Sequence, residues 1–152
     1  MEVQIIDYQP QYRDDFKRLN EEWISHYFTL EPHDSEQLGD PQKYILSGGG
    51  RIFLALYGSD IIGTVALIKV SETSYELGKM AVSPKFQGLG IGKKLGMHLI
   101  EEAKKIGCKH LYLESNKKLQ PALNLYRQLG FTEVPVGNTP YSRANFRAEM
   151  FF

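Results

Sequence analysis

The sequence predicts an α/β fold with a central mixed β-sheet flanked by helices. The predicted elements follow the order β-α-α-β-β-β-α-β-α-β-β, which combines consecutive strands with strands separated by helices. Turns join the three middle strands, and helical periodicity of apolar residues marks the longer segments. At 152 residues, of which 42% are hydrophobic, the whole chain, residues 1–152, is expected to fold as a single domain.

The N-terminal part of the chain is expected to form one strand and two helices. Residues 3–8 are predicted as a first strand, and apolar residues spaced as on one helix face predict a helix over 12–28. The segment Glu31-Pro32-His33-Asp34 is expected to break this helix. A short helix is predicted over residues 40–46, and Gly48-Gly49-Gly50 ends it.

Three strands are predicted in the middle of the chain. Residues 51–57 and 61–70 are joined by a hairpin turn at Gly58-Ser59-Asp60. The strand over 61–70 is apolar on both faces through most of its length, which is typical of a central strand. A turn at Ser71-Glu72-Thr73 leads to a third strand over 75–82, which precedes a glycine-rich loop.

Helices and strands alternate in the C-terminal half of the chain. Apolar residues on one side predict a helix over 90–106, and the glycine that follows is typical of a helix C-terminus. A short strand over 110–114 leads to a second helix over 121–129, which also ends at a glycine. Residues 131–134 and 145–152 are predicted as the last two strands.

Composition argues against several classes of function. Lys and Arg total 18, as do Asp and Glu, so the net charge is zero and nothing indicates bulk attraction to nucleic acid or to a membrane. Cys108 is alone, the N-terminus has no signal-peptide pattern, and no apolar run reaches the length of a membrane span. The four histidines have no metal-ligand spacing. We therefore expect a cytoplasmic protein with no metal site.

The most informative motif is Gln87-Gly88-Leu89-Gly90-Ile91-Gly92-Lys93, between a predicted strand and an amphipathic helix. Alternating glycines at a helix start leave backbone N–H groups unshielded, and these groups together with the helix dipole favour a phosphate. Gly90 and Gly92 also allow a ligand to approach the backbone closely. The motif indicates a site for a phosphorylated cofactor, and its alternative is a glycine-rich turn before an ordinary helix.

The spacing of this motif narrows the choice of cofactor. A P-loop requires another glycine upstream and a Ser or Thr where Lys94 stands, and a dinucleotide-binding loop requires a third glycine that is missing. The pattern Q/R-x-x-G-x-G/A does fit, with Gln87, Gly90 and Gly92 at its defined positions. This pattern is the acyl-CoA pyrophosphate signature of the GNAT family of N-acetyltransferases, which the chain resembles.

A second motif adds to the resemblance. The strand Leu111-Tyr112-Leu113-Glu114-Ser115-Asn116 precedes Ala122-Leu123-Asn124-Leu125-Tyr126 and Leu129-Gly130-Phe131, which is similar to the family's strand, Asn and A-x-x-L-Y-x-x-x-G-F pattern. The two motifs have the order and spacing of the family, and the predicted element order matches the GNAT fold across nearly the whole chain. One departure is that Leu119 stands where members often have Asn, whereas Asn116 lies further upstream.

The resemblance implies acetyl-CoA as cosubstrate. In the family, the strand before the glycine loop diverges from its neighbour, so that its backbone groups pair with the pantetheine amides. A backbone N–H near Val82 can then polarise the thioester carbonyl. The residues expected to bind the cofactor are Met80, Ala81, Val82, Gln87, Gly88, Leu89, Gly90, Ile91, Gly92, Lys93, Asn116 and Ala122.

Two side chains are predicted to act in catalysis. Tyr126 corresponds to the family's general acid, a phenol that protonates the departing thiolate; its alternative is a core tyrosine on an apolar helix face. Glu76 lies on the strand that lines the acetyl group in the family, and it is the candidate base for the attacking amine. The alternative for Glu76 is an exposed strand residue or a partner of Lys79.

The acceptor side is the part least defined by the sequence. Glu31 is a candidate for binding the acceptor amine, and Tyr27 belongs to the early helices that shape the acceptor pocket in the family. Arg143 is placed in a late loop, where it could meet an acceptor carboxylate or only solvent. Small amines, amino acids, antibiotics and protein amino termini all stay open as acceptors.

These expectations combine into one function with two alternatives. We expect an acetyl-CoA-dependent N-acetyltransferase in which a primary amine attacks the thioester directly in a ternary complex, since no nucleophile for an acyl-enzyme is evident. Parts of the chain resemble a bacterial subgroup of the family, and a homodimer is compatible with it. The alternatives are a catalytically weak acyl-CoA-binding module or sensor, and a nucleotide-binding protein, which the missing phosphate-loop patterns disfavour.

Overall fold

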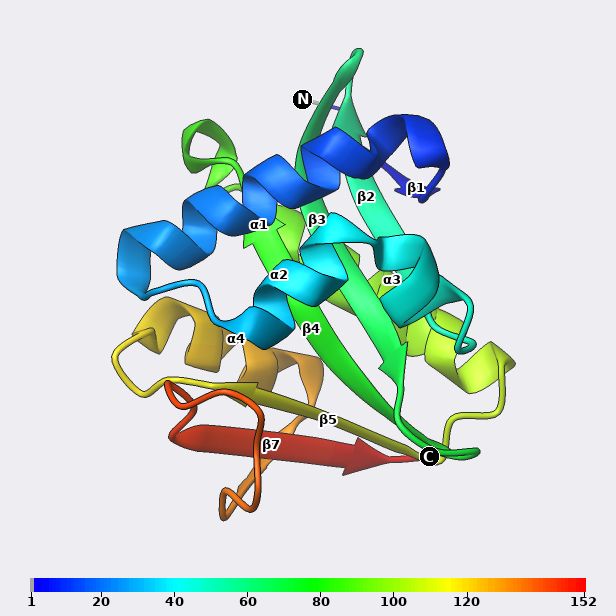
Figure 1. Ribbon diagram of the computed structural model, residues 1–152. Coiled ribbons are helices and arrows are strands. Elements are labelled where there is room, and N and C mark those ends of the chain that lie inside the picture. Colours follow the sequence, from blue (N-terminus) through cyan, green and yellow to red (C-terminus); the bar gives the residue numbers. More distant parts are fainter. Residues whose placement is uncertain (1) are drawn as a thin grey trace.

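A seven-stranded mixed β-sheet runs through the computed structural model, which describes residues 2–152 (Figure 1). The strand order is β1-β2-β3-β4-β5-β7-β6, and every neighbouring pair is antiparallel except β4 and β5. The strands are β1 (Gln4–Asp7), β2 (Arg51–Tyr57), β3 (Asp60–Lys69), β4 (Ser74–Val82), β5 (His110–Ser115), β6 (Thr132–Val134) and β7 (Phe146–Phe151). The predicted mixed sheet with flanking helices is confirmed.

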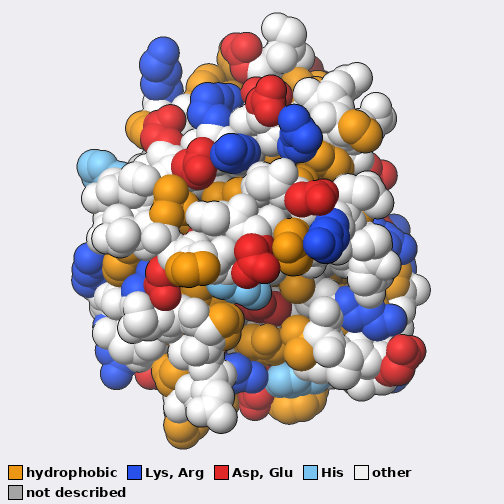
Figure 2. Space-filling view, viewed as in Figure 1, with side chains coloured by type: hydrophobic (Ala, Val, Ile, Leu, Met, Phe, Trp, Pro, Cys, Tyr) orange, Lys and Arg blue, Asp and Glu red, His pale blue; other side chains and the backbone are white. Residues whose placement is uncertain are grey.

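Helices cover both faces of this sheet, with α1 and α2 on one face and α3 and α4 on the other (Figure 1). The helices are α1 (Arg13–Tyr27), α2 (Pro32–Gly39), α3 (Ile91–Lys105) and α4 (Gln120–Leu129), with short 3-10 turns at Pro10–Tyr12 and Pro84–Phe86. Figure 2 shows positive and negative side chains interspersed over the face of α1 and α2. Within residues 2–152, no helix combines the length and the apolar character needed to cross a membrane.

The central strands separate two apolar cores, one beneath each pair of helices. In β2, Phe53 and Ala55 belong to the core that contains α3, whereas Ile52 and Leu54 belong to the core that contains α1. Successive strand residues point to opposite faces, so a strand covered on both sides is apolar along its whole length. In β3, residues 61–68 are all buried, which confirms the prediction that this strand is central.

The structure corrects the prediction that residues 31–34 only interrupt a helix. Glu31 is the N-cap of α2, the following proline is the first helical residue, and the Glu31 N–H donates to Asp34 Oδ2 at 3.0 Å. Proline is tolerated there because the first backbone nitrogens of a helix have no helical acceptor. The helix predicted over residues 40–46 is a short π-helix at Gln42–Leu46.

β4 and β5 separate after a short parallel contact. Residues 74–76 pair with residues 110–112, and beyond them β4 continues beside β3 while β5 continues beside β7. A bulge places Lys79 and Met80 of β4 opposite Val65 of β3, and Lys79 has a φ of 51° in the left-handed region. The sheet therefore has a gap in its middle, along one edge of β4, as the family resemblance implies.

Candidate active site

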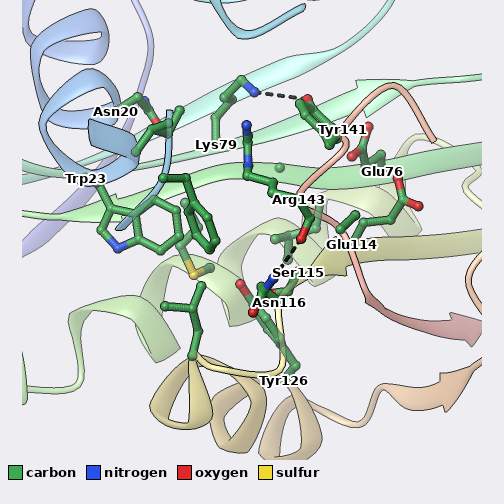
Figure 3. A pocket seen from close by; sticks show the side chains of 17 residues that line it. Asn20, Trp23, Glu76, Lys79, Glu114, Ser115, Asn116, Tyr126, Tyr141 and Arg143 are labelled. Carbon is green, nitrogen blue, oxygen red and sulfur yellow. Dashed lines mark hydrogen bonds between the residues drawn. The ribbon is translucent and has the colours of Figure 1, made fainter. Parts of the chain in front are cut away.

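A pocket opens where β4 and β5 separate, and side chains from α1, β4, the end of β5, α4 and the loop before β7 line it (Figure 3). The gap in the sheet lets residues from both faces reach this pocket. Glu76 lies on the face covered by α1, because its strand neighbours Tyr75 and Leu77 belong to the opposite core. Tyr126 belongs to α4 on that opposite face. Side chains from both faces of the sheet therefore share one pocket.

Buried polar groups hold the bulge of β4 in the pocket wall. Asn20 Nδ2 on α1 donates to Thr64 Oγ1 at 3.0 Å and to the Phe16 carbonyl at 2.9 Å. Thr64 Oγ1 in turn donates to the Lys79 carbonyl at 2.9 Å. Asn20 and Thr64 are both buried, so removal of one partner would leave an unsatisfied polar group in the core. These bonds tie α1, through β3, to the strained residue of β4.

Glu76 is a buried carboxyl on the pocket wall, with 9% of its surface exposed. Burial raises the pKa of Glu76 to about 7; the charge of Lys79 opposes this rise, and the charge of Glu114 adds to it. The ion-pair partner of Lys79 is Asp34, at 2.9 Å. Glu76 is therefore neither an exposed strand residue nor the direct partner of Lys79. It is a group whose charge changes near neutral pH.

Tyr126 is half-buried, packs against the core and lines the pocket. Its ring meets Phe131 edge-on, with 6.3 Å between the ring centroids. Burial raises the pKa of Tyr126 to about 12, and a hydrogen bond with Ser115 opposes that rise. The phenol therefore keeps its proton at neutral pH. Tyr126 therefore both packs against the core and lines the pocket.

The glycine loop presents its backbone to open space between β4 and α3. Gly88 and Gly90 have φ values of 79° and 80°, and Gly90 is the N-cap of α3. Such values are strained for an L side chain, and a Cβ on Gly90 would meet no atom within 4 Å. Ile91 is buried in the core and anchors the helix start. The first N–H groups of α3 are thus left unshielded beside the gap.

The other residues predicted to bind the cofactor lie in this loop, at the end of β4, after β5 and at the start of α4. Gln87 Nε2 donates to the Val82 carbonyl at 3.2 Å, which joins the loop to the end of β4. Gly92 lies close to α4, because a Cβ there would approach Leu125 Cδ2 to 3.2 Å. Met80 lines the pocket. Leu89 and Lys93 are exposed, Ala122 is half-buried and Ala81 is buried. Asn116 is described below.

Comparison with known proteins agrees with this geometry. Residues 13–131 match the model of the acetyltransferase (GNAT) family. The chain belongs to this family. The prediction made from the two sequence motifs is confirmed.

Relatives of this GNAT chain are named as N-acetyltransferases. The uncharacterized N-acetyltransferase YjgM of Escherichia coli is 34% identical over 89 residues, which is 57% of this chain and 53% of the relative. The [ribosomal protein bS18]-alanine N-acetyltransferase of Salmonella typhimurium is 34% identical over 91 residues, or 60% of this chain and 62% of the relative. The chain therefore spans less than two thirds of the length of these two relatives.

Solved structures share the whole fold. A GNAT acetyltransferase from Staphylococcus aureus Mu50 has a TM-score of 0.89 and 25% sequence identity, with 99% of both chains covered. An acetyltransferase of Bacillus subtilis, crystallised in complex with CoA, has a TM-score of 0.74 and 19% identity, again with 99% of both chains covered. At 19% identity, the similarity to the Bacillus subtilis protein shows a shared fold and nothing about function.

A charged cluster closes one side of the pocket of this GNAT protein. We call Glu31, Asp34, Lys79, Tyr141 and Arg143 the Asp34 cluster. Arg143 donates to both carboxylate oxygens of Asp34, at 2.8 and 2.9 Å, and to Glu31 Oε2 at 3.0 Å. Lys79 Nζ donates to Asp34 Oδ1 at 2.9 Å and to the Tyr141 hydroxyl at 3.0 Å (Figure 3). The cluster joins α2, β4 and the loop before β7.

The cluster keeps its central carboxylate ionised. Burial acts to raise the pKa of Asp34, but the hydrogen bonds from Arg143 and the charge of Lys79 outweigh it and hold that pKa well below its usual range. The neighbouring phenol responds in the opposite direction, since burial and the charges of Glu76 and Asp34 raise the pKa of Tyr141. Asp34 is therefore a fixed negative charge that two cations share.

Two residues predicted to bind the acceptor, Glu31 and Arg143, bond to each other in the structure. Glu31 Oε2 accepts from Arg143, and Glu31 Oε1 accepts from the Ser142 N–H at 3.0 Å. Tyr27 is 36% exposed and borders a neighbouring hollow near Gln87, outside the residues that line the main pocket. The acceptor roles of these residues stay predictions.

Asn116 also has partners within the protein. Its Nδ2 donates to the Arg143 carbonyl at 2.8 Å, and its Oδ1 accepts from the Lys118 N–H at 3.0 Å. Both ends of the amide are engaged, and the Nδ2 bond links the end of β5 to the loop before β7. The predicted contact of Asn116 with the cofactor is untested, and it would have to share these groups.

Sequence reasoning gave no site role to three polar residues of the pocket region: Asp34, Lys79 and Glu114. One local signal was present, because the Glu-Pro-x-Asp spacing around Asp34 is that of a helix start. The other two reach the pocket region only through the tertiary fold. Among the residues described, no group of three or more His, Cys, Asp or Glu side chains could hold a metal ion.

Proposed function

We propose that this protein transfers the acetyl group of acetyl-CoA to a primary amine, by direct attack within a ternary complex. The observation that carries the proposal is that Tyr126 and Glu76 line one pocket, at the gap between β4 and β5, although they lie on opposite faces of the sheet. A donor of protons and an acceptor of protons on two sides of one site suit an acyl transfer between two bound substrates.

The cofactor is assigned to the glycine loop and the free edge of β4. The pyrophosphate would lie at the start of α3, where Gly88 and Gly90 leave the backbone uncovered. The pantetheine would pair with the edge of β4 from Met80 to Val82, which β5 does not cover. The acetyl group then enters the pocket beside the bulge. A fold relative that was crystallised with CoA supports the choice of cofactor.

Each chemical step is then assigned to one residue. Glu76, ionised above a pKa of about 7, takes a proton from the acceptor ammonium, directly or through water. The amine nitrogen forms a bond to the thioester carbonyl carbon, and the carbon–sulfur bond breaks. Tyr126, still protonated, donates its proton to the departing thiolate. The nitrogen loses its second proton as the amide forms, which restores the proton of Tyr126, and Glu76 releases its own proton to water. The products are an N-acetylated amine, CoA with a free thiol and one proton.

A panel of primary amines, each mixed with acetyl-CoA and the purified protein, tests the proposal through release of CoA thiol. Acceptor-dependent release and an acetylated amine in the mass spectrum are the expected results. Tight CoA binding without turnover of any amine would overturn the transferase assignment in favour of an acyl-CoA-binding module. Thermal protection by ATP equal to that by CoA would contradict the cofactor assignment itself.

A further inference from the structure

The charged groups around the pocket are unequally paired. Both cations of the Asp34 cluster, Lys79 and Arg143, are bonded to carboxylates of the protein. Asp34 is fully buried and the Lys79 side chain is 4% exposed, so water cannot easily replace these contacts. Glu31 and Asp34 together match the charges of these two cations, so the cluster carries no excess positive charge. The cluster therefore offers no free cation to an acidic acceptor.

One carboxylate oxygen of the pocket region has no hydrogen-bond donor among the described residues. Glu114 Oε1 accepts from Thr139 Oγ1 at 2.8 Å, but the buried Oε2 has no hydrogen-bond partner. The nearest cation, Arg147, has its NH1 3.9 Å from Oε2, which is beyond hydrogen-bond distance. The Glu114 side chain is 4% exposed and lines the pocket near Glu76 (Figure 3). A buried carboxylate oxygen without a donor is costly.

We propose that Glu114 Oε2 binds the ammonium group of the acceptor, and that the pocket selects amines with no carboxylate on the carbon that bears the nitrogen. This inference rests on the proposed acetyl transfer and names the acceptor class for it. Simple alkylamines and the amino termini of peptides share this chemistry, since in a peptide the carboxyl group has become an amide. Free α-amino acids do not share it.

Charge repulsion provides the selectivity. An α-amino acid carries its carboxylate on the same carbon as the ammonium, so an ammonium at Glu114 would bring that carboxylate toward Glu114 and Glu76. Like charges brought together in a largely desolvated site repel strongly. Arg143 and Lys79 are already bonded, and the Arg147 guanidinium lies over the Tyr112 ring at 4.0 Å. No compensating cation is free in the pocket as described.

The ammonium would also prepare Glu76 for its role. A positive charge near Glu76 favours the ionised carboxylate and so lowers its pKa, in opposition to burial. Binding of the correct acceptor would therefore generate the base that removes its proton. An acceptor with an adjacent carboxylate would cancel much of this effect. Selectivity is then expected in turnover as well as in binding.

Matched acceptors that differ in the α-carboxylate test the proposal on the unmodified protein. Phenethylamine is compared with phenylalanine, and an alanine-initiated peptide amide with free alanine. CoA-thiol release gives kcat/KM, and calorimetry on CoA-saturated protein gives affinity without turnover. We expect the member without the carboxylate to be favoured roughly 10-fold or more in both measurements. The better of the two favoured compounds distinguishes a small amine from a peptide terminus. Equal values within each pair would overturn the proposal.

The substitution Glu114→Gln tests the residue. It should weaken binding of the preferred amine roughly 10-fold or more, since the carboxylate charge that pairs with the ammonium is lost and only a neutral amide oxygen stays as acceptor, while CoA affinity stays the same. The difference between the amine and the amino acid should shrink. The control is Glu149→Gln, on β7, because Glu149 pairs with His110 at 2.9 Å and does not line the pocket. Unchanged amine affinity in a folded Glu114→Gln variant would contradict the assignment.

Failure of this inference is distinguishable from failure of the proposed function. Selective amine binding without thiol release would contradict acetyl transfer and support the amine site. Thiol release with amines and amino acids alike would support acetyl transfer and contradict the selectivity. If no amine binds to the CoA-saturated protein and none is acetylated, the proposed amine site is wrong.

Discussion

The two ends of the proposed site are built in different ways. The glycine-loop end is made by one continuous segment, from the end of β4 through Gly90 to the start of α3. The Asp34 cluster at the other end joins residues more than a hundred positions apart, such as Glu31 and Arg143. One end uses backbone conformation, and the other uses side-chain charges held by tertiary contacts.

This difference has a consequence for variation within one fold. A loop whose function depends on uncovered N–H groups tolerates few side chains at its glycines, whatever surrounds it. A cluster of paired side chains can be exchanged as a set, because each charge needs only a partner and not a particular backbone. We therefore expect the cofactor end to be constant and the Asp34 cluster to differ among proteins with different acceptors. Substitutions can test whether the two ends are independent.

The largest effect is expected from Asp34→Asn, which removes the central charge of the cluster with little change in shape. Lys79 and Arg143 would stay largely buried without their shared counter-ion, so the free energy of unfolding should fall by about 3–5 kcal/mol. Denaturant titration measures this, and calorimetry should show nearly unchanged CoA affinity. The control Asp15→Asn breaks a largely exposed pair with Arg18 and should cost at most about 1 kcal/mol. Loss of CoA binding in a folded Asp34→Asn variant would show that the two ends are coupled.

The Asp34 carboxylate also makes the free energy of unfolding depend on pH in the acid range. The pKa of Asp34 is lower in the folded protein than in the unfolded chain, so its stabilising contribution is complete above the unfolded value of about 4. That contribution is lost as the pH falls below this value toward the folded pKa. The Asp34→Asn variant should therefore show a weaker loss of stability between neutral pH and acid than the unmodified protein.

The substitution Gly90→Val addresses the cofactor end. Valine at a φ of 80° is strained, and its side chain would occupy the open space above the loop. CoA affinity should fall by roughly two orders of magnitude or more. Gly58→Val is the matched control, because Gly58 also has a positive φ and open surroundings but lies in the β2–β3 turn. Unchanged CoA affinity in a folded Gly90→Val protein would remove the loop from the cofactor site.

A somewhat smaller effect is expected from Tyr126→Phe, which keeps the ring and removes the proton donor. With an identified acceptor, kcat should fall roughly 100-fold while CoA affinity stays nearly intact. The control Tyr75→Phe removes the hydroxyl of a buried tyrosine in the core against which Tyr126 packs, outside the pocket. If turnover of Tyr126→Phe is unchanged across pH, Tyr126 is a packing residue only.

The smallest effect, and the most dependent on pH, is expected from Glu76→Gln. In the unmodified protein kcat/KM should rise as the pH passes about 7, because Glu76 must lose its proton to act as a base. The variant should lose roughly 30-fold at neutral pH and recover part of this at alkaline pH, where more of the amine is already deprotonated. Glu72→Gln, on an exposed turn, serves as the control. A uniform loss at every pH would indicate that Glu76 positions the acceptor instead.

Much of the fold and of the cofactor end could be predicted from the sequence. The central strand β3 was evident because burial on both faces requires apolar residues at every position, and the start of α3 was evident from its glycines. The acceptor end could be predicted only in fragments. Glu31 and Arg143 were named as separate candidates, and nothing in the chain indicated that they bond to each other. Pairing between distant charges leaves no periodic pattern in a sequence.

The sequence by itself determined the family, the mixed sheet and the uncovered loop before α3, since these depend on local backbone preferences and on the period of apolar residues. Only the tertiary structure decided the environment of the charged groups. The fold put Asp34 of α2 between Lys79 of β4 and Arg143 of the loop before β7, and burial moved the pKa of Glu76 to about 7. The fold also leaves Glu114 Oε2 without a hydrogen-bond donor among the described residues. Charge states and unsatisfied groups depend on what surrounds a side chain in space, and a sequence does not specify that surrounding until the chain is folded.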